Sequence, residues 1–249
     1  MAAEPDAIES TNATAKAFAL TSGFWMMIAT FYGLLGATEL VAPDLTEGMA
    51  GVVFGRVRPT HINLVLFGFV TPGLLSAAFY FIPRLLRTPL FSDRLGVFTV
   101  VAWNIALVGT VASLAAGFTQ GREYAELIWP LDIMVVAAFC LVFFNFIMTV
   151  KNRREPILYV SVWYILAGCI LTACTFALGN VIWKPDSGAL VGIPDAILLW
   201  FYGHNVFGLL LTPLSAAVAY YVIPRACRAP LYSHTLSLLG FWALIVVYT

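Results

Sequence analysis

The sequence predicts an all-α protein, a polytopic bundle of transmembrane helices, and three observations support this. Hydrophobic residues make up 61% of the 249-residue chain and charged residues only 10%, with a mean hydropathy of +0.91. Soluble domains usually carry about 25% charged residues, so we expect lipid to solvate this chain. Apolar stretches of membrane-spanning length recur along it, and one pattern of residues occurs twice at a constant spacing. The net charge of zero gives no indication of a nucleic-acid partner.

Six apolar stretches are long enough to cross a bilayer, which takes about 20 residues of helix. They cover residues 17–42, 59–83, 95–118, 128–150, 157–183 and 194–223. A seventh begins near Leu236 and is still apolar at Thr249, so we expect it to be a truncated span. Residues 1–16 are polar and acidic, unlike the basic start of a signal peptide. We therefore predict a polar N-terminal segment, 1–16, and one transmembrane domain, 17–249.

The charges between the spans predict the orientation. One set of loops, together with the N-terminal segment, carries nine of the thirteen basic residues: Lys16, Arg84, Arg87, Arg94, Lys151, Arg153, Arg154, Arg225 and Arg228. The other set carries four, which are Arg56, Arg58, Arg122 and Lys184. Because basic loops stay in the cytoplasm, we expect the N-terminus to be cytoplasmic.

Two segments of the chain match each other at a fixed offset. Thr71-Pro72, Ile82-Pro83-Arg84 and Pro89-Leu90 recur as Thr212-Pro213, Ile223-Pro224-Arg225 and Pro230-Leu231, and Tyr80, Arg87 and Ser92 recur as Tyr221, Arg228 and Ser233. Each pair is 141 residues apart, as in 224 − 83 = 141. Matching prolines and arginines are not explained by shared hydrophobicity alone. The pattern indicates parallel internal repeats, which are common in membrane proteins.

Two histidines fall inside the predicted spans. His61 follows Pro59, which we expect at the start of the second helix, and His204 lies in the sixth span. A histidine in a membrane is costly unless it is paired or ligated, so each is either a metal ligand or a hydrogen-bonded link between helices. In the repeat, His61 corresponds to Tyr202, two residues before His204. Two residues rotate a side chain by about 200° around a helix, which favours two separate metal sites.

Charged residues lie beside the second span, at the end that should be poor in positive charge. Arg56 and Arg58 are either interfacial arginines or partners of anionic groups such as haem propionates, whose carboxylates suit the guanidinium. The loop between the third and fourth spans carries Glu123 and Glu126, which are either solvated or able to hold a hard cation.

At this point the sequence resembles a known family, subunit I of the haem-copper oxidases, and specifically the cbb3-type cytochrome c oxidases. The resemblance rests on Phe54-Gly55-Arg56-Val57-Arg58-Pro59-Thr60-His61, Glu123-Tyr124-Ala125-Glu126-Leu127, Trp129-Pro130, Asp132-Ile133, Tyr202-Gly203-His204-Asn205, Tyr232-Ser233 and Phe241-Trp242-Ala243-Leu244. It extends from about residue 20 to the last residue. The Glu-Tyr segment is also similar to nitric oxide reductases.

The resemblance implies a role for each candidate residue. His61 is then an axial ligand of the low-spin haem b, and His204 is one of three histidines on the copper ion CuB. Tyr248 matches the tyrosine that the family cross-links to that copper-ligand histidine. Arg56 and Arg58 match residues that hold haem propionates, and Glu123 matches a calcium ligand between them. Tyr220 and Ser237 match positions on the proton path from the cytoplasm.

The sequence departs from the family pattern in two places, and it holds only part of the ligand set. Phe201 stands where a tryptophan is usual, and Gly240 stands where many members have a histidine near the proton path. The remaining ligands of CuB, of haem b and of the high-spin haem b3 are absent. We therefore expect the N-terminal part of a longer subunit, or a split subunit that needs a second chain.

The implied function is a terminal oxidase in the bacterial inner membrane. It would reduce O2 to water with electrons from c-type cytochrome subunits and would translocate protons. Nitric oxide reduction is a rival, although that site usually employs extra glutamates and the sixth span has none. A secondary transporter is a rival from another class, since repeats and intramembrane histidines occur there too. Against it, the spans hold almost no buried acidic residues apart from Glu39 and Asp132, which lie near span ends.

Overall fold

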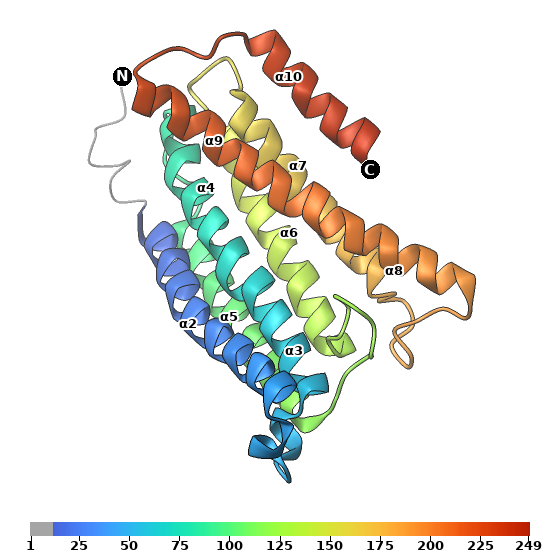
Figure 1. Ribbon diagram of the computed structural model, residues 1–249. Helices are drawn as coiled ribbons and strands as arrows, with labels where there is room; N and C mark the ends of the chain where they lie inside the picture. Colours follow the sequence, from blue (N-terminus) through green and yellow to red (C-terminus); the bar gives the residue numbers. More distant parts are fainter. Residues whose placement is uncertain (1–11) are drawn as a thin grey trace.

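A computed structural model describes residues 12–249 as a helical bundle (Figure 1). Helices make up 79% of the structure, and residues 12–249 contain no β-strand. Six helices are long and apolar enough to cross a membrane, which confirms the predicted fold class. Most of the predicted polar segment 1–16 lies outside the described residues, and the first helix begins at Ala13, so Lys16 lies in its first turn.

The spans follow one another with short connections. The first is α2 (Ala13–Val41), and the short helices η2 (Pro43–Thr46) and η3 (Ala50–Val52) lead to the second. The second consists of α3 (Phe54–Asn63), η4 (Leu64–Val70) and α4 (Thr71–Leu86). Then come α5 (Asp93–Ala116), α6 (Trp129–Lys151) and α7 (Val160–Gly179). The sixth span consists of α8 (Ile193–Asn205), η5 (Val206–Leu211) and α9 (Thr212–Cys227), and the last helix of α10 (His234–Ala243) and η6 (Leu244–Tyr248).

The start of the second span differs from the prediction. Pro59 does not open the helix, because α3 already begins at Phe54 and Pro59 lies inside it. The ring of a proline inside a helix removes one backbone hydrogen bond. Two side chains bind carbonyls around it instead: Thr60 Oγ1 donates to the Arg56 carbonyl at 2.7 Å and Asn63 Nδ2 to the Pro59 carbonyl at 2.9 Å. Pro59 thus lies within the helix, two residues before His61, and does not start it.

Neighbouring helices of the bundle pack side by side (Figure 1). Helix α2 contacts α3, α4 and α5; α6 lies between α5 and α7 and contacts both; and α7 contacts α8 and α9. The core is rich in aromatic side chains. The Phe18 and Phe79 rings stack at 5.4 Å, Phe79 lies 4.4 Å from Phe146, and Trp103 lies edge-on to Phe139 at 5.1 Å. Burial of such rings dominates packing energetics, and α4 also joins the two halves by contacting α9.

The backbone repeats along with the sequence. Helices α4 and α9 both have 16 residues, and their bounds differ by the same 141 positions (212 − 71 = 141). Both are followed by an arginine in the left-handed region, Arg87 at φ 51° and Arg228 at φ 50°. Ser92 and Ser233 then cap α5 and α10 through hydrogen bonds from the Leu95 and Leu236 amides. This agreement confirms that the internal match is structural.

The repeat includes an irregular helix. Both η4 and η5 are π-helical, and they occupy equivalent positions just after the two histidine-bearing segments. The chain also carries a π-helical stretch in η6. A π-turn inside an α-helix is rare and frequently marks a functional site.

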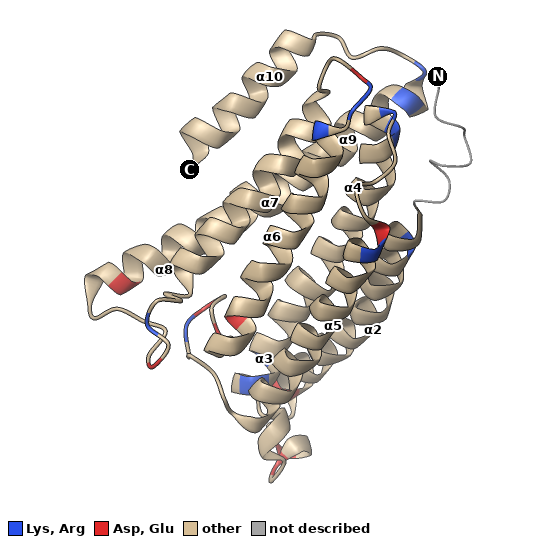
Figure 2. Ribbon diagram, turned by 180° about the vertical axis from the view of Figure 1, so that it is seen from behind, with Lys and Arg blue, Asp and Glu red and all other residues tan. Residues whose placement is uncertain are grey.

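The basic residues gather mainly at the end of the bundle where α4 and α9 terminate, which we call the basic end (Figure 2). The opposite end holds the loop 117–128 and the loop 180–192, with charges of both signs. Both histidine-bearing helices, α3 and α8, begin at the opposite end.

Candidate functional site

His61 is held by the first span. Its Nδ1 lies 2.8 Å from the carbonyl oxygen of Ala29. A carbonyl oxygen only accepts, so Nδ1 carries the proton and Nε2 keeps its lone pair. Gly33, one turn along α2, makes room for the ring, because a Cβ there would lie 2.7 Å from His61 Cε1. A ring nitrogen that donates to a backbone carbonyl while the other is free is the usual arrangement of a metal-ligating histidine.

A cavity of about 200 Å³ adjoins His61. It lies between the second and sixth spans, and its lining is apolar apart from His61 and Tyr124; the other lining residues are Ile62, Val65, Leu66, Val70, Phe207 and Leu211. An apolar cavity beside a histidine with a free ring nitrogen fits the edge of a haem macrocycle, whose ring is apolar and whose iron takes an imidazole. The residues here thus fit the haem that the resemblance implies.

His204 pairs with the last helix. Its ring lies parallel to the Tyr248 ring, with centroids 4.2 Å apart and an interplanar angle of 14°. His204 Nε2 lies 3.1 Å from the Tyr248 carbonyl oxygen, so Nε2 is the donor and Nδ1 keeps its lone pair. Gly208 allows this stacking, because a Cβ there would overlap the Tyr248 ring. The structure thus brings together the histidine and the tyrosine that the sequence singled out.

The two histidines face different neighbours, as the two-residue offset within the repeat predicts. His61 contacts α2, whereas His204 contacts η6. Within residues 12–249, no three His, Cys, Asp or Glu side chains lie close enough together to hold a metal ion. In the described part of the chain, the two histidines thus do not belong to one preformed metal cluster.

The two predicted propionate-binding arginines have protein partners here. Arg56 donates to the Ala115 carbonyl at 2.7 Å and lies against Gly117 at the end of α5. Arg58 makes two hydrogen bonds to Glu123, at 3.0 and 2.7 Å. The carboxylate that the resemblance assigns to calcium is thus occupied by Arg58, with both oxygens engaged.

The pKa values of the two glutamates in the loop 117–128 move in opposite directions. The hydrogen bonds from Arg58 lower the pKa of Glu123. Burial raises the pKa of Glu126, which is 4% exposed, although hydrogen bonds from Asn63 Nδ2 and the Tyr124 amide partly offset this. The two carboxyl groups of one short loop thus have pKa values shifted to opposite sides of the ordinary value.

The predicted proton-path residues lie near the basic end. Tyr220 lines a cavity of about 350 Å³ that also reaches His234, Ser161 and Tyr159. Ser237 is buried and donates to the His234 carbonyl at 2.7 Å.

Tyr164 of α7 contacts both α9, which carries Tyr220, and α10, which carries Ser237. The ring of Tyr164 stacks on Tyr220 at 5.8 Å and lies edge-on to Phe241 of α10 at 5.1 Å. A Cβ at Gly240 would lie 3.8 Å from the Tyr164 hydroxyl. The position that lacks the family's histidine thus faces a buried phenol, which sequence reasoning missed because nothing marks Tyr164 in its apolar span.

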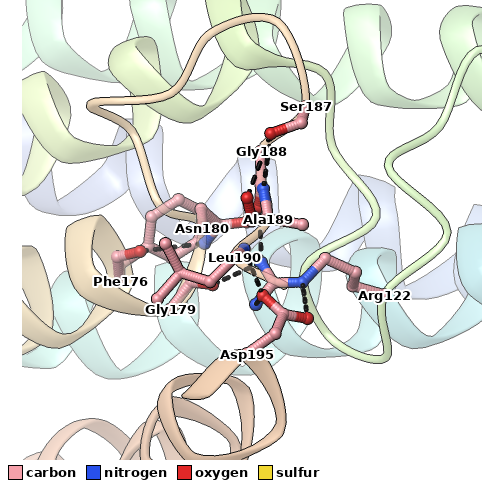
Figure 3. A network of polar contacts seen from close by, with 9 residues as sticks. All are labelled: Arg122, Phe176, Gly179, Asn180, Ser187, Gly188, Ala189, Leu190 and Asp195. Carbon is pink, nitrogen blue, oxygen red and sulfur yellow. Dashed lines mark hydrogen bonds and ion pairs between the residues drawn. The ribbon is translucent and has the colours of Figure 1, made fainter. Parts of the chain in front are cut away.

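Sequence reasoning also missed a polar network around Arg122 (Figure 3). Arg122 is 6% exposed and forms an ion pair with Asp195 at 2.9 Å. It also donates to the carbonyls of Gly179 and Gly188, at 2.6 and 2.8 Å. Two of its partners are backbone carbonyls, which leave no trace in the sequence. The third partner, Asp195, is 73 residues away in the chain, so the sequence does not signal that the two charged residues meet.

The sequence matches a known protein family over most of its length. The family model described as Cytochrome C and Quinol oxidase polypeptide I matches residues 13–249. The chain is similar to the cbb3-type cytochrome c oxidase subunit CcoN1 of Stutzerimonas stutzeri, 34% identical over 94% of this chain and 50% of that protein. It is also similar to cytochrome c oxidase subunit 1 of Rhodobacter capsulatus, 33% identical over 98% of this chain and 48% of that protein. The chain thus spans about half the length of these curated relatives.

Proposed function

Because the chain belongs to the family of cytochrome c and quinol oxidase polypeptide I, we propose that it forms part of the catalytic subunit of a cbb3-type terminal oxidase. The reaction proposed is reduction of O2 to water with electrons from cytochrome c, coupled to proton translocation. The single observation that supports it most is the pair of histidines, each hydrogen-bonded through one ring nitrogen to a carbonyl of another helix. Haem and copper follow from the family, and they supply electron transfer and oxygen binding.

In this proposal His61 holds the low-spin haem b. The Ala29 carbonyl accepts a hydrogen bond from Nδ1, which leaves the Nε2 lone pair available to the haem iron and would increase the basicity of the ligand. The apolar cavity beside the ring keeps water from the macrocycle. This chain thereby orients one axial ligand and shapes one face of the haem site.

His204 is proposed as a ligand of CuB through Nδ1. The Tyr248 ring lies against it, so its phenol is held beside the site where oxygen is reduced and can supply a proton and an electron there. The other CuB ligands and the ligand of haem b3 come, in this proposal, from a further segment of subunit I, since the relatives are about twice as long as the chain. The c-type cytochrome subunits are the proposed electron donors.

Protons are proposed to enter at the basic end. The cavity at His234 gives access to Tyr220, whose ring stacks on Tyr164, and Tyr164 reaches α10 beside Gly240. Ser237 lies one turn before Gly240 on the same helix. A chain of hydroxyl groups with water between them can relay protons, because each group both donates and accepts.

The proposed orientation of the chain in the membrane agrees with proton entry at the basic end. Because the set of loops at the basic end, with the N-terminal segment, carries nine of the thirteen basic residues, we propose by the positive-inside rule that this end and the N-terminus face the cytoplasm of a bacterial cell. Calcium is not part of the proposal, because Arg58 engages both carboxylate oxygens of Glu123 and residues 12–249 offer no three-ligand acidic group.

Replacing each of the three histidines in the assembled oxidase tests the proposal. His204→Ala should remove copper and abolish oxygen reduction, and His61→Ala should remove the low-spin haem absorbance. His234→Ala, at the basic end, is the matched control and should keep full haem and copper contents. Metal analysis and reduced-minus-oxidised spectra measure these. Retention of copper and of oxygen reduction in His204→Ala would overturn the proposal, and iron in place of copper would favour nitric oxide reduction.

A further inference from the structure

The five residues Arg122–Glu126 contact both histidine-bearing helices. They form a tight turn, in which the Ala125 amide donates to the Arg122 carbonyl at 2.9 Å. Tyr124 within it adopts φ 61°, a conformation that costs a non-glycine residue energy and persists where the surroundings fix it. This turn is held rigidly although it lies in a loop.

Toward α3, the turn holds both sides of His61. Glu123 pairs with Arg58, three residues before the histidine. Glu126 accepts a hydrogen bond at 3.0 Å from Asn63, two residues after it. Contacts on either side of one residue fix the position and the rotation of that part of the helix.

Toward α8, the same turn makes two further contacts. Arg122 binds Asp195 in the first turn of α8, through Nε to Oδ2 at 3.1 Å and through the ion pair at 2.9 Å (Figure 3). The Tyr124 carbonyl accepts a hydrogen bond at 2.9 Å from the hydroxyl of Tyr202, two residues before His204. Tyr202 is fully buried, so this bond lies in a medium of low dielectric constant, where it is strong.

Tyr202 is also the residue that corresponds to His61 in the repeat (61 + 141 = 202). In the first copy of the repeated helix the position carries the histidine. In the second copy it carries a phenol that binds the turn. The same repeat position thus holds the proposed metal ligand, His61, in the first copy and the residue that binds the turn, Tyr202, in the second copy.

We propose that Arg122–Glu126 is a positioning element that sets the placement of the His204 helix relative to the His61 helix, and hence of the copper site relative to haem b. This inference rests on the proposed function, because it takes both histidines as metal ligands. Arg122 and Tyr202 are its positioning residues on the His204 side, and Glu123 acts on the His61 side. None of the three touches the reacting atoms.

The test uses the assembled, metal-loaded oxidase with Arg122→Gln, Tyr202→Phe and Glu123→Gln, and Lys184→Gln as control, since Lys184 is an exposed residue of the neighbouring loop. Tyr202→Phe keeps the ring and removes the hydroxyl that donates to the Tyr124 carbonyl. We expect it to retain wild-type haem and copper contents while electron transfer from haem b to the oxygen site slows about tenfold. This is less than the roughly hundredfold cost of a full 1 Å misplacement, because only one of the contacts to the turn is lost.

Hydrogen–deuterium exchange gives a second reading that does not depend on activity. Arg122→Gln and Tyr202→Phe should speed exchange in residues 193–205 and leave 54–63 unchanged, and Glu123→Gln should do the reverse. Wild-type exchange and wild-type electron transfer in Tyr202→Phe at full metal content would overturn the positioning role. By contrast, if the wild-type complex carries no metal that depends on His61 or His204, the proposed function itself fails. If Arg122→Gln does not assemble, Tyr202→Phe still decides.

Discussion

The ring of His204 lies parallel to the ring of Tyr248 at 4.2 Å, although 44 residues separate them in the chain. The contact joins the sixth span to the last helix, and Gly208 lies directly beneath the tyrosine ring. The pairing therefore depends on the lack of a side chain at Gly208 as well as on the two rings themselves.

Gly208→Ala should separate these rings. Because the new methyl group would overlap the Tyr248 ring, we expect oxygen reduction in the assembled oxidase to fall about a hundredfold, in line with an ångström-scale misplacement. Tyr248→Phe keeps the ring and removes the hydroxyl, which separates packing from chemistry. Gly55→Ala, where nothing lies within 4 Å, is the control. Unchanged turnover in Gly208→Ala would show that the stacking is not needed.

Gly33→Ala should disturb His61 in the same way. A Cβ at this position would lie 2.7 Å from His61 Cε1 and 2.9 Å from Nδ1, so the ring must move away from the Ala29 carbonyl. We expect a shift in the low-spin haem absorbance and in its reduction potential. Gly23→Ala lies in the same helix with open space around it and should leave both unchanged. Identical spectra for the two variants would contradict the assignment of His61.

The Arg58–Glu123 pair should weaken in acid. Because the folded-state pKa of Glu123 is lowered, its contribution to stability is present above the ordinary value of 4.5 and is lost as the pH falls through the folded pKa. The pair is partly exposed, so we expect about 0.5 kcal/mol or less. Thermal melts between pH 3 and about 7 measure it, and Glu123→Gln should flatten that part of the profile.

Glu126 should act in the opposite sense. Its pKa is raised by burial, so its contribution is fully present below pH 4.5 and is lost as the pH rises through the folded pKa. Glu126→Gln should remove this loss at higher pH but also one of the two acceptor roles of the carboxylate. Melting temperatures that fall with the same slope in Glu126→Gln and wild type would contradict this expectation.

Tyr164→Phe should slow proton delivery. It removes the hydroxyl that faces Gly240 and leaves the ring that stacks on Tyr220. We therefore expect proton uptake to fall about a hundredfold or more, the usual scale for a lost proton-transfer group. Metal contents should not change. A pH-sensitive dye in stopped flow measures the uptake.

The same position offers a rescue experiment. A Cβ at Gly240 would have only the Tyr164 hydroxyl within 4 Å, at ordinary contact distance, so the backbone leaves room for a side chain to start there. The double variant Tyr164→Phe/Gly240→His should recover most of the lost uptake. Normal uptake in the single variant Tyr164→Phe would remove this residue from the path.

Much of the fold could be predicted, because it depends on local properties of the sequence. The six spans follow from runs of apolar residues, and the repeat follows from prolines and arginines at one offset. The error at Pro59 has a physical reason: proline is favoured in the first turn of a helix, but here Thr60 and Asn63 cap the carbonyls around it and the helix starts earlier. Nothing in the sequence of Phe54–Arg58 alone marks that earlier start.

The site was predictable only in part. His61 and His204 are conspicuous because titratable groups are rare in a membrane span, whereas only the family resemblance singled out Tyr248. Their partners are not conspicuous, since they are the backbone carbonyl of Ala29 and the missing side chains of Gly33 and Gly208. Arg122 was grouped with the surface charges, although it is buried against two carbonyls and Asp195. Tertiary packing decides such roles.

The π-helical segments η4 and η5 constrain how this chain can evolve. A wide turn accommodates an extra residue without lengthening the helix by a full turn. Deleting one residue from Leu64–Val70 would regularise the hydrogen bonding but rotate His61 by about 100° against α4, away from its carbonyl on α2. Both copies of the repeated helix therefore need their π-helical segment to keep its length. We expect point substitutions in these segments to be tolerated and changes of length not to be.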